Sequence, residues 1–299
     1  MAKAFWRQKQ NFGPRSRWAH SMIYDPVRQR TVLFGGHFEG EDEYAADTWE
    51  WDGQTWVQVA DMGPQGRYRH KMVYDSSRKR IVLYGGRIVK NSIATNETWQ
   101  WDGNEWLQLA ETGPLHGHST TAMAYDKQRD RIVLFGYMNT TQSETWEWDG
   151  DEWTQQEDSG PSVRSYSAMA YDSVRNRIVL FGGFHDERGA VGDTWEWDGA
   201  TWKQRADFGP SPRHEHAMAF DDDRSRVVLF GGMANDHRLG DTWEWDGTRW
   251  LQRHNMGPPN RSNHALSYDS DRRRLVLFGG GSNSILFGDT WELPGLPPE

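Results

Sequence analysis

Hydrophobic and polar positions follow a pattern of roughly fifty residues that is written six times along the chain. The first half of each copy holds a short apolar stretch, a polar turn and a β-branched run, as at 217–220 and 226–230 in the fifth copy. Apolar runs of this kind, bounded by turn residues, predict buried strands. A Gly-Gly pair then ends the run, because glycine adopts backbone conformations closed to other residues. Each copy therefore predicts a first β-hairpin.

Aromatic and acidic residues alternate in the second half of each copy. In the fifth copy residues 241–245 read Asp-Thr-Trp-Glu-Trp, and an Asp246-Gly247 turn leads to a further strand at 250–252. An Asp-Gly pair between aromatic strand residues is a strong hairpin signal. The Thr-Trp pair returns every 47 to 50 residues, a period typical of propellers. Four short antiparallel strands per copy predict an all-β, six-bladed β-propeller, which hides strand edges by closing into a ring.

Two groups of residues resemble kelch repeats. They are the Gly-Gly pair with the spaced aromatic residues that follow it, and the segment before the first strand, as in Arg213-x-x-His216-x-Met218. This resemblance covers nearly the whole chain, and it implies that the segment before each first strand lies near the mouth of a central channel. Kelch propellers include peptide-binding adaptors, lectin-like modules, structural modules and some enzymes. The resemblance therefore implies a fold and no single activity.

The two ends of the chain predict how the ring closes. The sixth copy stops at 291–293 without a fourth strand, whereas residues 5–8 read Phe-Trp-Arg-Gln and match the fourth-strand pattern at 56–58. We expect the N-terminal segment to complete the last blade, because this pairing removes an exposed strand edge. Residues 1–299 are then a single domain.

Composition limits the chemistry and the partners. The 299 residues include eighteen Trp and no Cys, and the formal net charge is -9. Regularly spaced aromatic rings bury enough area for a compact core, and the absence of Cys excludes disulfides and thiolate sites. An acidic balance disfavours nucleic acid. The first residues lack the apolar segment of a signal peptide, and no apolar run reaches membrane length. We expect a cytoplasmic protein that binds neither nucleic acid nor membrane.

Residues that recur in every copy are expected to be scaffold. Seventeen of the eighteen Trp occupy repeated strand positions, and third-strand acids such as Glu196 recur in the same way. Acid–base catalysis by two carboxylates needs two different environments, which a symmetric repeat does not supply. The exception among the Trp is Trp18. Its counterparts in the other copies are Tyr68, Ser119, Ser165, His214 and Ser262.

The variable residues lie on one predicted face. Connections from the second to the third strand share this face with connections to the next blade, and its loops include 37–44, 87–90, 184–188 and 233–238. Variable loops on a rigid scaffold are the usual place for binding, although they can also be plain solvated connectors. Arginines recur just before the first strands. They are Arg17, Arg67, Arg164, Arg213 and Arg261, with His118 in the third copy.

These arginines allow two interpretations. A ring of guanidiniums at the channel mouth would bind carboxylate or phosphate groups through bidentate bonds. Alternatively, each Arg satisfies loop carbonyls or an acid within its own blade. His20, His70, His216 and His264 follow three residues after an Arg, but Thr121 and Ser167 take the same place elsewhere. Small hydroxyls fit a structural hydrogen bond better than a metal site, so we expect no metal and no cofactor.

Further unusual residues complete the candidate set. Tyr137 replaces the second glycine in the third copy, and Trp18, Tyr68 and Arg69 mark the first two copies. His214 and Glu215 stand at the matching place in the fifth copy. A shared pocket requires Trp18, Arg67, His118, Tyr137 and His214 to converge.

Three functions compete. The first is a noncatalytic propeller that binds a small polar or anionic ligand, or an acidic peptide, on the variable face near the channel. The second is an enzyme that transfers protons through His118, His214 or His185, assisted by Glu215, Asp186 or Tyr137. Catalytic residues are otherwise unknown. The third is a carbohydrate-binding propeller that uses exposed aromatic residues at several equivalent sites.

Overall fold

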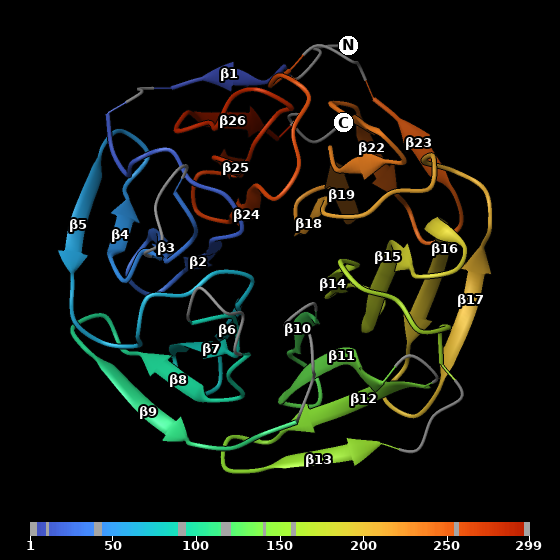
Figure 1. The fold of residues 1–299 in the computed structure, drawn as a ribbon, viewed down its shortest axis with the longest axis horizontal. Helices are drawn as coiled ribbons and strands as arrows, with labels where there is room; N and C mark the ends of the chain where they lie inside the picture. The colour runs from blue at the N-terminus through green and yellow to red at the C-terminus, as the bar shows by residue number, and fades with distance from the viewer. Residues whose placement is uncertain are drawn as a thin grey trace.

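The computed structural model describes residues 5–9, 12–38, 44–88, 94–114, 121–139, 142–156, 160–253 and 257–295. In these residues the chain forms six four-stranded antiparallel sheets, which stand as blades around a central axis (Figure 1). The same residues contain no helix long and apolar enough to cross a membrane. The six-bladed propeller expected from the repeat is confirmed.

The blades share one order of strands from the axis outwards. The innermost strands are β2 (Ser21–Asp25), β6 (Lys71–Asp75), β10 (Ala122–Asp126), β14 (Ala168–Asp172), β18 (Ala217–Asp221) and β24 (Ala265–Asp269). The second strands are β3 (Arg30–Phe34), β7 (Arg80–Tyr84), β11 (Arg131–Asn139), β15 (Arg177–His185), β19 (Arg226–Phe230) and β25 (Arg274–Phe278).

The third strands carry the Thr-Trp pairs, and the fourth strands form the outer rim. The third strands are β4 (Thr48–Trp51), β8 (Thr98–Trp101), β12 (Gln142–Trp148), β16 (Gly189–Trp197), β22 (Thr242–Trp245) and β26 (Thr290–Pro294). The fourth strands are β5 (Trp56–Ala60), β9 (Trp106–Ala110), β13 (Trp153–Gln156), β17 (Trp202–Ala206), β23 (Trp250–Gln252) and β1 (Arg7–Gln8). A small extra hairpin joins β20 (Met233–Ala234) to β21 (His237–Arg238) in the fifth blade.

The second strand ends at the Gly-Gly pair in four blades, whereas β11 and β15 continue beyond this position, contrary to expectation. In the fifth blade Gly231 and Gly232 have φ values of 64° and 99°, a region that only glycine enters at low cost. A Cβ on Gly232 would lie 2.8 Å from the carbonyl oxygen of His214. The pair thus lets the segment before the inner strand pack directly against the end of the second strand.

The hydrophobic core lies between blades. Val32 and Phe34 of the first blade pack with Ile81, Leu83 and Trp106 of the second, and the other neighbouring blades pack in the same way. Fully burying one large apolar side chain contributes about 1.5–3 kcal/mol. Each blade therefore depends on its neighbour for most of its apolar burial.

The repeated tryptophans also link neighbouring blades through hydrogen bonds. Each fourth-strand indole donates to a third-strand Thr of the preceding blade, for example Trp250 Nε1 to Thr194 Oγ1 at 2.9 Å. Third-strand acids accept from arginines in their own blade: Glu244 Oε1 binds Arg224 at 2.5 Å, and its other oxygen binds Arg253. The scaffold role expected for the repeated Trp and Glu residues is confirmed.

The two ends of the chain close the ring as predicted. β1 pairs with β26 through Arg7 opposite Glu292 and Gln8 opposite Trp291, and the two strands lie side by side in Figure 1. Trp6 is buried against the fifth blade and donates its indole N–H to Thr242 Oγ1 at 3.1 Å. The inner strands of neighbouring blades contact one another around the axis.

Candidate binding surface at the channel mouth

Five arginines occupy matching positions in the lead-in segments, which are the residues just before each inner strand. All five side chains are buried, with at most 2% of each residue exposed, and each binds an acid of its own blade. The pairs are Arg17–Asp47 at 2.6 Å, Arg67–Glu97 at 2.8 Å, Arg164–Asp193 at 2.5 Å, Arg213–Asp241 at 2.6 Å and Arg261–Asp289 at 2.6 Å. These guanidiniums therefore fasten each lead-in to its own blade.

Arg213 illustrates how such a guanidinium is hydrogen-bonded within its own blade. Its two terminal nitrogens contact both carboxylate oxygens of Asp241, and it also donates to the carbonyl oxygens of Ser211 and Gly231. Burial alone would raise the pKa of Asp241, but hydrogen bonds and the charge of Arg213 lower it overall. Of the two interpretations of these arginines, the contacts favour the one in which each Arg binds loop carbonyls and an acid of its own blade.

Trp18 belongs to an aromatic patch, which we define as Trp18, His37, Tyr44 and Tyr68. Backbone bridges join Trp18 to His37 and His37 to Tyr44. The ring centroids lie close together, with Trp18 to Tyr68 at 5.6 Å and Tyr44 to Tyr68 at 4.7 Å. Aromatic pairs at these distances contribute about 0.5–1.5 kcal/mol beyond their burial. The first two blades thus present a preformed aromatic surface on the variable face.

A second ring of residues surrounds the end of the channel, which we call the mouth. The next lead-in position is left-handed in every described blade, at Ala19, Arg69, Tyr166, Glu215 and Asn263, with φ between 54° and 61°. Such a backbone costs on the order of 1–3 kcal/mol for a residue other than glycine. Backbone hydrogen bonds run between neighbouring members, for example from Arg69 N to Ala19 O at 2.7 Å. These bonds stabilise the unusual backbone and fix the five side chains at the mouth.

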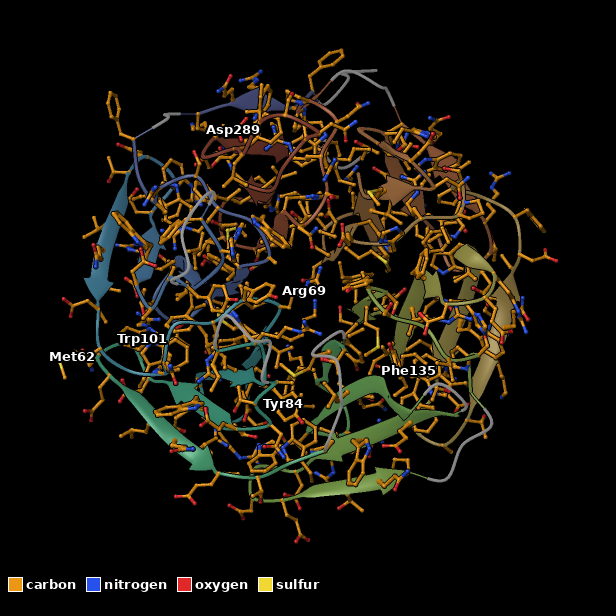
Figure 2. The ribbon with its side chains drawn as sticks, in the orientation of Figure 1. Met62, Arg69, Tyr84, Trp101, Phe135 and Asp289 are labelled. Carbon is orange, nitrogen blue, oxygen red and sulfur yellow. The ribbon has the colours of Figure 1, made fainter. Side chains whose placement is uncertain are left out.

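Arg69 spans the mouth. Its guanidinium, carried by the second blade, donates to Tyr166 Oη of the fourth blade at 2.6 Å and lies 3.4 Å from Glu215 Oε1 of the fifth. It also lies over the Tyr166 ring, 4.4 Å from the centroid, and 5.7 Å from the Trp18 ring. Figure 2 shows Arg69 near the centre of the ring of blades, whereas Met62 lies at the outer edge. Arg69 therefore connects the aromatic patch with the opposite side of the mouth.

The opposite side carries a second aromatic group, Tyr166, Phe184 and His214. His214 lies 5.2 Å from Phe184 and 5.9 Å from Tyr166, measured between ring centroids. Burial lowers the pKa of His214, and Glu215 partly opposes this effect. The Glu215 carboxylate itself is held by Arg69 and by Ser262 Oγ at 3.1 Å. His214 and Glu215 thus belong to the wall of the mouth.

The channel below the mouth is a cavity of about 620 Å³ lined by the inner strands. A smaller hollow of about 60 Å³ lies between the mouth and this cavity. Buried histidines surround both spaces at His20, His70, His216 and His264. Their rings pack against a Phe of the preceding blade, as His20 does against Phe278 at 5.5 Å. Burial and nearby charge lower the pKa of all four, that of His20 to about 3, so these imidazoles are neutral.

Lys71 is a candidate that the sequence comparison missed. It lines both the large cavity and the smaller hollow. At the same place the other blades have Ser21, Ala122, Ala168, Ala217 and Ala265. Comparing copies column by column, as for Trp18, would have shown this one charged residue. Tyr166 was also missed, and His37 and Tyr44 were included only as the two ends of the variable loop 37–44, because their contacts depend on which loops meet in space.

The remaining candidates do not join this site. Tyr137 is buried within β11 of the third blade, where the other blades need glycine. His118 lies outside the described residues. The single pocket proposed for Trp18, Arg67, His118, Tyr137 and His214 is therefore not formed as expected, since Arg67 is enclosed in its blade. Within the described ranges, no group of three or more His, Asp or Glu side chains could hold a metal ion.

Two family models match the chain. Residues 141–294, slightly more than half of the chain, match the model described as the KLHDC2/KLHL20/DRC7 Kelch-repeats domain. Residues 52–198 match the Attractin/LZTR1 beta-propeller. We find no match among the curated proteins. The two matches overlap and together extend from the first to the sixth blade.

Proposed function

The chain belongs to the kelch-repeat propellers, and from this premise we propose that it is a noncatalytic protein-binding scaffold whose partner docks on the variable face at the mouth. The observation that carries this proposal is the continuous set of ring and guanidinium contacts from the aromatic patch through Arg69 to the second aromatic group. Trp18 and Tyr166 are partly exposed in it, whereas Tyr68 and His214 are buried. Trp, Tyr and Arg are the residues most enriched at energetic centres of protein interfaces. Here they meet on the face where the blades differ most.

The rigidity of this surface supports binding. Trp18 and Tyr68 stand on lead-in segments that buried arginines fasten to the blades, and backbone bridges hold both residues to the neighbouring loops. Side chains that are already ordered lose little conformational freedom when a partner binds. A partner segment therefore meets a preformed surface.

The partner we favour is an extended peptide segment that carries an acidic side chain. Arg69 lies directly beside the aromatic patch, and Arg87 is joined to Tyr68 by backbone hydrogen bonds. The Arg69 guanidinium, which also contacts Glu215, favours a partner carboxylate next to an apolar or aromatic side chain. The five buried lead-in arginines are no part of this proposal. The cytoplasmic location expected from the sequence also stays a prediction.

Peptide display tests this function because a random library samples many partner segments at once. We expect the wild-type protein to enrich acidic peptides with aromatic residues from such a library, and the best peptide to bind with one-to-one stoichiometry in calorimetry. Replacing Trp18 and Tyr68 together by Ser, the residue at this position in the fourth and sixth blades, should weaken binding at least tenfold.

A matched control distinguishes binding at this surface from nonspecific binding to exposed hydrophobic side chains. Phe208 is 71% exposed, and its counterpart Met62 lies at the outer edge in Figure 2. Phe208→Ser should bind the selected peptide like the wild type. Equal binding by the Trp18→Ser, Tyr68→Ser variant, or failure of the library to yield any specific peptide, would contradict the proposal.

A further inference from the structure

One charged side chain reaches into the channel where its equivalents are small. Lys71 begins β6, and the same position holds Ser or Ala in the other five blades. Among the residues of this position, only Lys71 extends far enough to line the hollow below the mouth. Its charge acts on Glu215 and His216, which belong to the fifth blade across the axis. The ammonium thus projects over the channel.

The charges around Lys71 do not balance. Arg69 is paired with Glu215, and the nearby histidines are neutral because burial lowers the pKa of each. The lead-in arginines are matched by acids of their own blades. Within the described chain no carboxylate forms an ion pair with Lys71, and no residue hydrogen-bonds its ammonium. One positive charge is therefore left over below the mouth.

An uncompensated cation in such a place favours an anion. Burial and the neighbouring Arg69 guanidinium lower the pKa of Lys71 to about 8, while Glu215 opposes this only partly. Taking a charge out of water is costly unless an opposite charge accompanies it. A bound monoanion would supply that charge, whereas a dianion such as phosphate would exceed the single surplus charge.

The walls of the cavity indicate the rest of the ligand. Ile23, Val73, Ala124 and Ala170 form an apolar part of the cavity wall, and Ser267, Lys127 and Asp222 also line the cavity. Its volume of about 620 Å³ lies within the range of roughly 300–1,000 Å³ found for small-molecule sites. A short alkyl chain fits these walls, and a carboxylate fits the ammonium at their upper end.

We propose that the central channel binds a small organic carboxylate whose head group pairs with Lys71 and whose apolar chain extends between the inner strands. Arg69, Tyr166 and Glu215 cover the head group at the mouth, so they control entry from the variable face. This site lies inside the ring, and it does not depend on the protein partner proposed for the surface above it.

The test uses a series of simple probes: acetate, butanoate, hexanoate and octanoate, with hexan-1-ol as the uncharged match. We expect calorimetry at pH 7 to show one-to-one binding of a member of the series with four or more carbons. Its affinity should fall about 30-fold between pH 7 and pH 9.5, as a pKa of about 8 requires of a ligand that needs the charged amine. Hexan-1-ol should show no such fall.

Two variants decide whether Lys71 is the partner. Lys71→Ala installs the residue that four other blades already have, so the fold should persist with an unchanged or higher Tm. Carboxylate affinity should drop at least tenfold and lose its dependence on pH. Lys127→Ala is the control, because Lys127 lines the same cavity but begins the turn after β10. It should change the affinity less than twofold.

A covalent readout covers the case in which the alanine variant folds poorly. Reductive methylation of the wild-type protein, followed by peptide mass spectrometry, should modify Lys71 more slowly when the bound carboxylate is present. Absence of binding by every carboxylate, wild-type affinity in Lys71→Ala, or equal methylation of Lys71 with and without the ligand would each overturn the proposal.

Discussion

Acid should destabilise this propeller through its buried histidines, and His20 gives the clearest case. His20 is 6% exposed, and burial together with the Arg17 guanidinium lowers its pKa to about 3, against an ordinary value of 6.5. The unfolded chain therefore binds a proton at a pH where the folded protein does not. The free energy of unfolding must fall as the pH drops below about 6.5, and the loss continues towards pH 3.

The size of the effect follows from these two pKa values. At pH 7.5 both states keep His20 neutral, so the residue adds almost nothing to the pH dependence. At pH 5 the unfolded state is almost fully protonated and the folded state is not, which removes about 2 kcal/mol from the free energy of unfolding. His70, His216 and His264 act in the same direction. Their combined effect is large against a typical stability of about 5–15 kcal/mol.

His20→Thr tests this reasoning, because Thr121 already occupies the same place in the third blade. The free energy of unfolding is measured by urea denaturation, followed by Trp fluorescence, at pH 7.5 and pH 5. We expect the variant to lose stability at pH 7.5, where the packing of His20 on Phe278 is gone. Between the two pH values, however, it should lose about 2 kcal/mol less than the wild type.

An exposed histidine serves as the control for His20. His237 has a side chain that is 63% exposed, so His237→Thr removes no buried imidazole and should not reduce the loss of stability between pH 7.5 and pH 5. If His20→Thr and the wild type lose stability in parallel between pH 7.5 and pH 5, the imidazole is not held neutral by burial. The pH argument for the other three histidines would then fail as well.

Two further predictions concern the scaffold. Deleting residues 1–10 removes β1 and the buried Trp6. The Tm measured by calorimetry should fall by several degrees or more, since burying one such side chain contributes about 1.5–3 kcal/mol, and an unchanged Tm would refute ring closure by this strand. Arg213→Met leaves the Asp241 carboxylate without its buried partner, so urea unfolding should show a loss of about 3–5 kcal/mol. Adding Asp241→Leu should restore part of this stability, and a single variant as stable as the wild type would contradict the assigned role.

The architecture could be predicted because the same physical solution is repeated six times. A Gly-Gly pair, a Thr-Trp pair and an Asp-Gly turn each predict one local structure, and each recurs in at least five of the six copies. The closure by residues 5–8 followed from the same logic, because Trp6 matches the fourth-strand column and packs in the fifth-to-sixth blade core. Repetition therefore makes the fold the best determined property of the sequence.

The role of the lead-in arginines could be recognised only from the three-dimensional structure. Arg213 and Asp241 are 28 residues apart, and a loop of different length separates the matching pairs in other blades. Both residues recur in the sequence, yet nothing in their spacing shows that they meet. Once strand β22 lies beside β19, the acid just before β22 is next to the arginine, which decides between the two interpretations in favour of ion pairs within each blade.

Comparing the six copies of the repeat reveals a candidate site only when every equivalent position is compared. The position of Trp18 was conspicuous because its residues vary in size and polarity between the copies, and it led to the aromatic patch. The Lys71 column has the same form, with one large charged residue among Ser and Ala, but a lysine near a strand start is ordinarily explained by solvent exposure. Only the position of β6 on the axis makes this lysine unusual, because there its ammonium faces a cavity. In a symmetric fold, a residue that departs from the repeat is more informative about function when its position is shielded from bulk solvent, because solvent exposure then does not explain it.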